Sequence, residues 1–201
     1  HLLAELDEPG EWYFDPTDNK LYLWPRAPLT AATSISVWAG PTVFKIEGGC
    51  NYTHVKRLTF QNLASGACVD ISNGTHNLVA GCTFRNIGPS GNAFNIWSGT
   101  DNGILSCDIY DVHNASRCYG GSVGNDVIIR GGNFIENCHF TQVYSKSMYG
   151  KVTALNGAGN RFRHNLMHNH NGQTVTMAGV DHLVEFNEVF NTGIEEGDGG
   201  S

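Results

Sequence analysis

Residues 78–87 read LVAGCTFRNI, and five related phrases occur before and after this one along the chain. Five of the six phrases place Cys or Asn, and the first copy places Leu58, two positions before an apolar residue, and a further repeated position follows three residues later. The other copies are HVKRLTFQNL (54–63), ILSCDIYDV (104–112), FIENCHFTQV (134–143), RFRHNLMHNH (161–170) and HLVEFNEVFNT (182–192). A unit that recurs in this way predicts a solenoid in which each copy forms one coil.

The spacing and internal pattern of the repeat favour one kind of solenoid. Successive copies lie 24, 25, 31, 27 and 22 residues apart. Inward and outward residues alternate within a copy as they do in a strand, and turns rich in Gly and Asn follow. A leucine-rich repeat has a similar length, but its repeated Leu and its helical segment are missing here. The sequence therefore predicts an all-β fold, a right-handed parallel β-helix of about six coils.

Stacked coils place equivalent residues directly above one another, about 4.8 Å apart. An apolar column is expected from Phe60, Phe84, Ile109 and Phe140. Cys82, Cys107 and Cys138 share another inward position, where stacked side chains rarely reach disulfide geometry, so we expect buried thiols. Asn165 and Asn187 continue that position, and their amides can bond from coil to coil.

A second short strand follows the turn in most copies. It is expected at residues 69–71, 94–96, 153–155 and 175–177. We place the outward positions of this sheet at Asp70, Asn95, Ser122, Ala154 and Thr176. The longest interval carries extra residues, which we place in a corner loop at about 113–125, because insertions in solenoids go to corners. This mostly neutral face suits hydrogen bonding to sugar hydroxyls, and a sheet face that only contacts solvent is the alternative for the early coils.

The composition excludes several classes of protein. The formal net charge is −7, with 12 Lys and Arg against 19 Asp and Glu, so the clustered basic residues needed for nucleic acid are missing. No apolar run is long enough to span a bilayer. No metal-binding spacing such as C-x2-C links Cys50, Cys68 and Cys118.

Residues 6–25 read LDEPGEWYFDPTDNKLYLWP and predict a β-hairpin. Two aromatic strands, 11–15 and 20–24, flank a turn at 16–19. These strands are too apolar to stay exposed, and a solenoid needs a cap over the end of its core. We therefore divide the chain into a hairpin cap, residues 1–40, and a parallel β-helix, residues 41–201. A sugar-stacking platform is the alternative role for the hairpin.

The hairpin, the coils and the segment FNTGIEEGDGG (190–200) together resemble the secreted bacterial right-handed parallel β-helix proteins related to glycoside hydrolases, in the pectate-lyase-like superfamily. In that family an L-D-x-P-G-E-W-Y-x-D hairpin precedes the helix, and a D-G-G or D-x-G motif on a late coil leads into a further strand. The resemblance implies a secreted or periplasmic protein with further coils after Ser201. It also implies a polysaccharide or oligosaccharide partner, and we expect the protein to bind it as a monomer.

Three acidic residues cluster in the late segment: Glu195, Glu196 and Asp198. Glycoside hydrolysis commonly uses two carboxyl groups, one as the acid and one as the base or nucleophile. We favour Asp198 as catalytic, because the D-G-G motif falls on it, followed by Glu196 and then Glu195. A Ca²⁺ site and a plain acidic surface loop are the alternatives, and we expect no other cofactor.

The phrase RHNLMHNHN (163–171) gathers histidines beside the expected groove. An imidazole at such a place can act as a general base or bind a sugar, although His and Asn are also ordinary residues of β-helix corners. The number of histidines also allows a zinc site, but no acidic fourth ligand lies nearby in sequence. The corner residues around it complete the expected substrate-binding set. This set is His168, His170, Asn171, Lys151, Tyr149, Tyr119 and Gln173.

Three functions remain open from the sequence. The leading one is a glycoside hydrolase that acts on a plant, algal or microbial polysaccharide through paired carboxylates. A polysaccharide lyase or uronate epimerase must neutralise a uronate carboxylate with Arg, Lys or Ca²⁺, and the outer face offers few basic residues. A non-catalytic carbohydrate-binding or adhesion solenoid is the third.

Overall fold

The computed structural model of the chain describes residues 3–33, 35, 40, 42–124, 126–143 and 151–193. The chain divides into two compact units, His1–Ser36 and Val37–Ser201.

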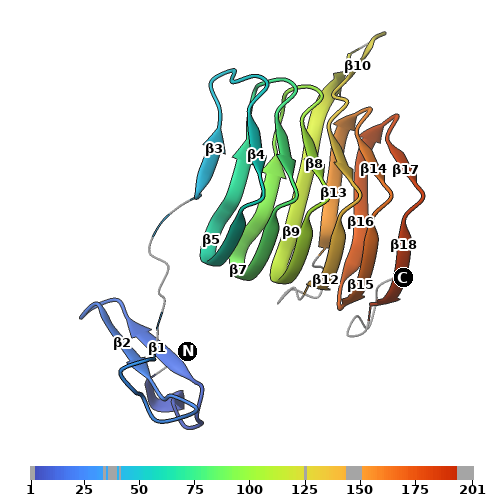
Figure 1. Cartoon of the computed structure of the whole chain (residues 1–201). Helices are drawn as coiled ribbons and strands as arrows, with labels where there is room; N and C mark the ends of the chain where they lie inside the picture. The colour runs from blue at the N-terminus through green and yellow to red at the C-terminus, as the bar shows by residue number, and fades with distance from the viewer. Residues whose placement is uncertain are drawn as a thin grey trace. The chain divides into compact units, whose positions relative to one another are not determined.

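The first unit holds the predicted hairpin. A 3₁₀ turn, Leu3–Glu5, precedes strands β1 (Trp12–Asp15) and β2 (Lys20–Leu23), which pair antiparallel (Figure 1). Asp15 pairs with Lys20, so the four-residue turn lies where the sequence places it. The predicted hairpin is therefore confirmed.

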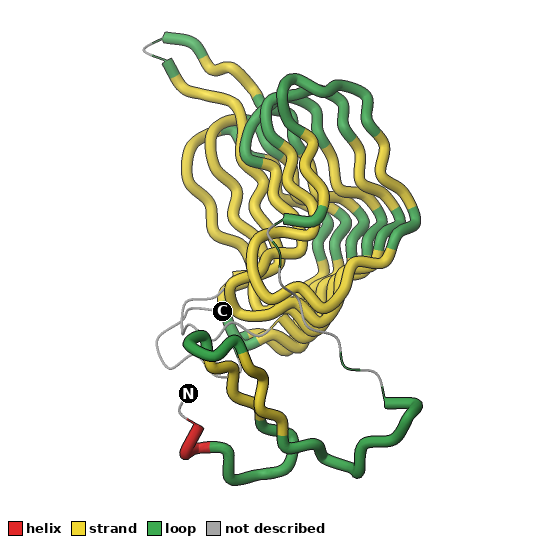
Figure 2. The backbone as a smooth tube through the Cα atoms, turned by 90° about the vertical axis from the view of Figure 1, so that its left-hand side faces the viewer, coloured by secondary structure: helices red, strands yellow, loops and turns green. Residues whose placement is uncertain are grey.

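The second unit is a parallel β-solenoid whose strands form three faces, which Figure 2 shows nearly end on. Face 1 is a six-stranded sheet of β4 (His54–Lys56), β6 (Leu78–Ala80), β8 (Gly103–Leu105), β11 (Phe134–Glu136), β14 (Arg161–Arg163) and β17 (Leu183–Glu185). Faces 2 and 3 belong to one ten-stranded sheet, because three long strands bend from one face into the other. These strands are β5 (Thr59–Ile71), β7 (Thr83–Ile96) and β9 (Asp108–Val123).

Shorter strands complete the two bent faces. Face 2 continues through β12 (His139–Val143), β15 (Leu166–His170) and β18 (Glu188–Thr192). Face 3 consists of the second halves of the long strands together with β3 (Phe44–Ile46), β13 (Lys151–Ala158) and β16 (Gln173–Val180). The predicted all-β solenoid of about six turns is thereby confirmed.

The repeated phrases stack in register, as the sequence predicts. Phe60 pairs with Phe84, Phe84 with Ile109, and Ile109 with Phe140. All four lie in the core, and the rings of Phe60 and Phe84 stack with centroids 5.1 Å apart. This column is the apolar spine of the solenoid.

The inward cysteines are free thiols, as expected. Cys82, Cys107 and Cys138 are buried one above another, and the Cys107 N–H donates to the Cys138 Sγ at 3.5 Å. Asn165 continues the ladder by accepting from the Cys138 N–H at 2.9 Å, and Asn187 accepts from the Asn165 N–H at the same distance. The predicted change from thiol to amide within one ladder is confirmed.

A second Asn ladder was not anticipated from the sequence. Its members, each immediately before a face 1 strand and almost fully buried, are Asn77, Asn102, Asn133 and Asn160. The Asn102 Oδ1 accepts from both the N–H and the Nδ2 of Asn77, at 3.0 and 2.9 Å, and the Asn133 Oδ1 accepts from the Asn102 N–H at 2.8 Å. The Asn that precedes the face 1 strand in four of the six copies was the available signal.

The corner between faces 1 and 2 needs a left-handed backbone in every described coil. The residues with positive φ there are Arg57, Gly81, Ser106, Asn137, His164 and Phe186. Five of the six are not glycine, although this conformation is costly for other residue types. The type of the corner residue therefore does not predict the position of this corner. The repeated inward residue that directly follows it does.

Strand β9 corrects two predictions. Arg117 pairs with both Asn95 and Ala154, so Arg117 and not Ser122 holds the outward position in the third coil. Ser122 instead pairs with Ile129 in an antiparallel hairpin between β9 and β10 (Ile128–Arg130), which contains the extra residues. The error arose because the corner of this coil is short, and the insertion comes one corner later than expected.

The thiols give a direct test of this core. Only Cys50 of the six cysteines is exposed, and burial raises the pKa of Cys118 to about 12, which suppresses the reactive thiolate. We expect a thiol reagent to label one cysteine in native buffer and all six after denaturation. The absorbance of the chromophore that the reagent releases counts the reactive thiols in the native and in the denatured protein. Labelling of Cys118 in the folded Cys50→Ser variant would contradict the buried placement.

Candidate functional site

The outer surface of face 3 carries a connected group of polar and aromatic side chains. We call it the Trp97 cluster, and it consists of Asp70, Asn95, Trp97, Arg117 and Tyr119. Asp70, Asn95 and Arg117 share one register position on β5, β7 and β9. The two aromatic residues follow two positions later, Trp97 directly after the end of β7 and Tyr119 within β9. Strand pairing, rather than proximity in sequence, brings these side chains together.

The Asp70 carboxylate organises one side of the Trp97 cluster. It accepts hydrogen bonds from Thr42 Oγ1 at 3.1 Å, Asn95 Nδ2 at 2.8 Å and Trp97 Nε1 at 3.2 Å. Asn95 is only 2% exposed, although it belongs to the outward column. The carboxylate therefore fixes both the amide of Asn95 and the edge of the indole.

The Trp97 indole is held from two further sides and still reaches solvent. The Arg117 guanidinium lies 5.1 Å from the indole centroid and donates to Asn95 Oδ1 at 3.4 Å. Tyr119 meets the indole edge-on, with centroids 5.8 Å apart and an interplanar angle of 79°. Trp97 is nonetheless 41% exposed. The cluster thus presents an apolar ring beside a cation, an amide and a carboxylate.

Face 2 brings together a second group, which the sequence did not reveal as a group. Its His139 Nε2 lies 2.9 Å from the His168 Nε2, and the rings stack with centroids 5.1 Å apart. Asp108 Oδ1 is 3.7 Å from His139 Nδ1, and Thr141 Oγ1 is 3.4 Å from His168 Nδ1. The ring of Phe190 stacks on the ring of His168, with centroids 4.8 Å apart. We call the two histidines the face 2 histidine pair.

The expected substrate-binding residues fall in several places. Tyr119 belongs to the Trp97 cluster, and Lys151 pairs in register with Gln173 at the start of their strands on face 3. Asn171 lies half-buried at the corner between β15 and β16, and His168 lies on face 2. Outside the described residues lie Tyr149, Glu195, Glu196 and Asp198.

His170 points into the coil and not onto the outer surface. It is 1% exposed, with its Nδ1 3.0 Å from the Gly172 carbonyl oxygen and its Nε2 3.3 Å from Thr174 Oγ1. Burial lowers the pKa of His170, so its neutral form is favoured. The chain itself occupies both ring nitrogens of this histidine.

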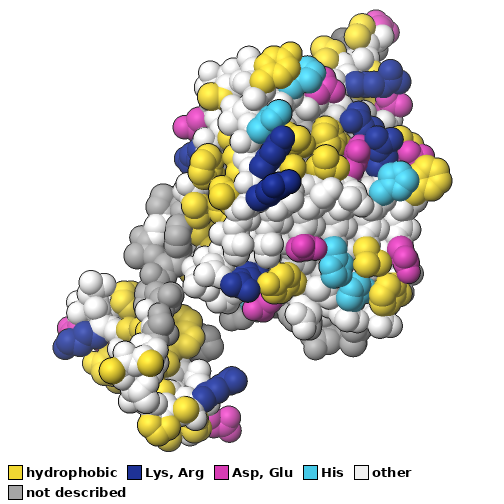
Figure 3. All heavy atoms as spheres, in the orientation of Figure 1, with side chains coloured by type: hydrophobic (Ala, Val, Ile, Leu, Met, Phe, Trp, Pro, Cys, Tyr) yellow, Lys and Arg dark blue, Asp and Glu magenta, His cyan; other side chains and the backbone are white. Residues whose placement is uncertain are grey.

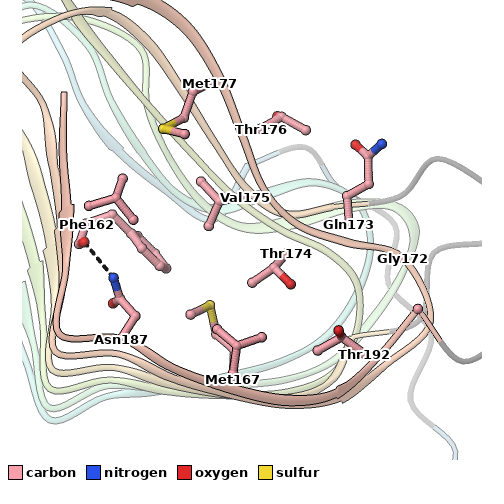
Figure 4. A pocket seen from close by; sticks show the side chains of 13 residues that line it. Phe162, Met167, Gly172, Gln173, Thr174, Val175, Thr176, Met177, Asn187 and Thr192 are labelled. Atoms are coloured by element: carbon pink, nitrogen blue, oxygen red, sulfur yellow. Dashed lines mark hydrogen bonds between the residues drawn. The ribbon is translucent and has the colours of Figure 1, made fainter. Parts of the chain in front are cut away.

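A cavity of about 580 Å³ opens at the last described coil (Figure 4). Its wall includes Phe162 and Met167 of the core together with Val175 and Met177 of β16, and Asn187 donates to the Phe162 carbonyl across it. These residues occupy the inward columns that the next coil covers elsewhere in the solenoid. The cavity is therefore lined by side chains of the solenoid core, and we assign it no ligand.

Comparison with known proteins adds no assignment: no family model, curated protein or solved structure matched the chain. Across the described ranges, no cluster of three or more His, Cys, Asp or Glu side chains has an arrangement suited to a metal ion. The described residues also include no helix that is both long and apolar enough to cross a membrane. The two outer faces therefore carry the features that indicate function.

Proposed function

We propose that the protein is a carbohydrate-active β-solenoid that holds a polysaccharide against face 3. The observation that carries this proposal is the exposed Trp97 indole, fixed between Arg117 and Tyr119 beside Asp70 and Asn95. An aromatic ring offers an apolar surface to the C–H face of a sugar, and the planar polar groups around it can bind the hydroxyls.

The rest of face 3 suits an extended polymer. Ala154 and Thr176 continue the register position of Arg117 on the following coils, so small side chains succeed the Trp97 cluster. Lys151 and Gln173 flank them and offer further hydrogen-bond donors. A saccharide chain lying across the strands would therefore meet the aromatic cluster first and a flatter polar surface after it.

We propose glycoside hydrolysis as the activity, with Asp198, Glu196 and Glu195 as the catalytic acids. Asp70 is the one carboxylate in the described outward column of face 3, whereas hydrolysis commonly uses a pair. Because Asp70 already accepts three hydrogen bonds, its role in the proposal is to position Asn95 and Trp97. The described residues thus support binding, and cleavage depends on the acidic segment.

A uronate polymer, cleaved by a lyase or altered by an epimerase, is a second candidate because of Arg117. The guanidinium stands in the centre of the outward column, where the sequence had placed a serine. Arg can bind a carboxylate in a bidentate fashion, which suits recognition of a uronate. Its contacts with Trp97 and Asn95 leave this cation on the proposed binding face.

Trp97→Ala is expected to weaken polysaccharide binding about tenfold, because an aromatic anchor contributes at least about 1.4 kcal/mol. Affinity electrophoresis or calorimetry against a panel of neutral and uronate polysaccharides would measure the loss. Tyr52→Ala is the matched control, since Tyr52 is 69% exposed but stacks on His76 at another corner. Equal losses in both variants, or no loss in Trp97→Ala, would contradict the proposed face.

The same panel separates hydrolysis from elimination. Hydrolysis releases reducing ends without a new chromophore, and a lyase produces an unsaturated uronate that absorbs in the ultraviolet. We expect Asp198→Asn and Glu196→Gln to abolish release of reducing ends while binding persists.

Arg117→Gln, in contrast, is expected to weaken binding of uronate polymers more than that of neutral ones. An ultraviolet-absorbing product would replace the hydrolase proposal with the lyase.

A further inference from the structure

The arrangement of the face 2 histidine pair carries an inference that is independent of carbohydrate binding. On the His139 ring, Nδ1 faces the Asp108 carboxylate at 3.7 Å, and on the His168 ring, Nδ1 faces Thr141 Oγ1 at 3.4 Å. A carboxylate, and a hydroxyl acting as acceptor, both favour a proton on Nδ1. With Nδ1 protonated in both rings, the two Nε2 atoms carry lone pairs.

Those two Nε2 atoms lie only 2.9 Å apart. Without an ion, an Nε2–H of one ring can donate to the Nε2 of the other at this distance, and a cation that displaces this proton meets both lone pairs. Two nitrogen ligands at right angles around a metal, with bonds of about 2.0–2.1 Å, are about 2.9 Å apart. The separation therefore matches neighbouring ligands of a square or octahedral ion, and is shorter than the roughly 3.3 Å of a tetrahedral one.

The surroundings favour a cation and hold the rings in place. In the outward column of His139, Asp108 lies on the preceding coil and Glu188 lies two coils further on. Figure 3 shows histidine side chains (cyan) between acidic ones (magenta) on the lower part of the visible face. Phe190 lies parallel to the ring of His168, with an interplanar angle of 1°, and limits its rotation. His139 keeps 39% of its side chain exposed, so an ion can enter from solvent.

We propose that His139 and His168 bind a divalent transition-metal ion through their Nε2 atoms, with Cu²⁺ preferred and Asp108 positioning His139. Imidazole suits Cu²⁺, Ni²⁺ and Zn²⁺, the divalent series gives Cu²⁺ the highest affinity, and a right-angled pair suits its tetragonal geometry. The protein supplies two ligands, and water completes the coordination sphere. Because the two residues lie on adjacent strands β12 and β15, the ion joins two coils.

Cu²⁺ titration by calorimetry tests the site, with Cys50→Ser in every protein to remove the exposed thiol. The parent is expected to bind one more equivalent of Cu²⁺ than the double variant His139→Gln/His168→Gln. Each single histidine variant should lose more than about tenfold in affinity at this site, and Asp108→Asn should lose about tenfold. The matched control is His54→Gln, an exposed histidine of β4 on face 1, which should bind like the parent.

Electron paramagnetic resonance provides a readout that stability does not affect. The parent should show Cu²⁺ with two nitrogen ligands, and the spectrum of His139→Gln should lose one of them. Equal stoichiometry and affinity in the parent and the double variant would overturn the metal site, and unchanged affinity in Asp108→Asn would overturn the role of Asp108. Circular dichroism without metal checks the fold of each variant. If His168→Gln unfolds, the comparison of His139→Gln with the parent tests the site alone, because His139 is partly exposed and its substitution should leave the fold intact.

Discussion

Phe84→Ala is expected to lower the free energy of unfolding of the solenoid by about 3–5 kcal/mol. Phe84 is fully buried, stacks on Phe60 at 5.1 Å and packs against Phe94 with centroids 5.6 Å apart. Removing the ring opens a cavity that the rigid coils above and below cannot fill. Urea denaturation followed by circular dichroism would measure the loss.

The control for this substitution is Phe186→Ala. Phe186 is 72% exposed and stacks only on His164, at 5.0 Å, so we expect a loss below about 1 kcal/mol. Equal losses of stability in Phe84→Ala and Phe186→Ala would contradict the placement of the repeated apolar residues in the core.

Asn102→Ala is expected to cost about 3 kcal/mol or more, although it removes only a small polar side chain. The Asn102 Oδ1 accepts from Asn77, and its Nδ2 donates to the Gly74 carbonyl at 3.1 Å. Truncation leaves the Asn77 N–H without this partner, at a cost of about 1–3 kcal/mol for an unsatisfied buried group. It also removes two further hydrogen bonds, worth about 1 kcal/mol each, although Asn77 Nδ2 keeps its bond to the Cys50 carbonyl and the Gly74 carbonyl keeps its bond from the Thr100 N–H. The same denaturation experiment measures the effect.

Asn51→Ala is the counterpart on the surface. The Asn51 side chain is exposed and accepts one hydrogen bond, from the Thr75 N–H at 2.8 Å. Water can replace that bond, so the expected loss is below about 1 kcal/mol. A small loss in Asn102→Ala, equal to that in Asn51→Ala, would show that water satisfies the interior ladder.

The core of the solenoid was predictable because stacking repeats one environment in every coil. An inward position such as that of Phe84 and Ile109 must stay apolar in each copy, so the repeat is visible in sequence. The Asn77–Asn160 ladder follows the same rule but was missed, because its polar residues precede the phrases and resemble turn residues.

The outer faces were harder to predict, because no core constrains them. Arg117 was misplaced because the third coil has a short corner, and a shift in alignment moves every outward residue after it. His139 and His168 are separated by 29 residues, and neither alone indicates a site.

The sequence by itself determined the solenoid, the positions of its inward ladders and the N-terminal hairpin. Periodic burial leaves a periodic residue pattern, and the hairpin depends on neighbouring residues alone. The tertiary structure decided which outward side chains meet: Asp70 with Asn95 and Trp97 on face 3, and the histidine pair on face 2. Such contacts join adjacent coils, and their partners are set by strand register and corner length, which vary from one coil to the next.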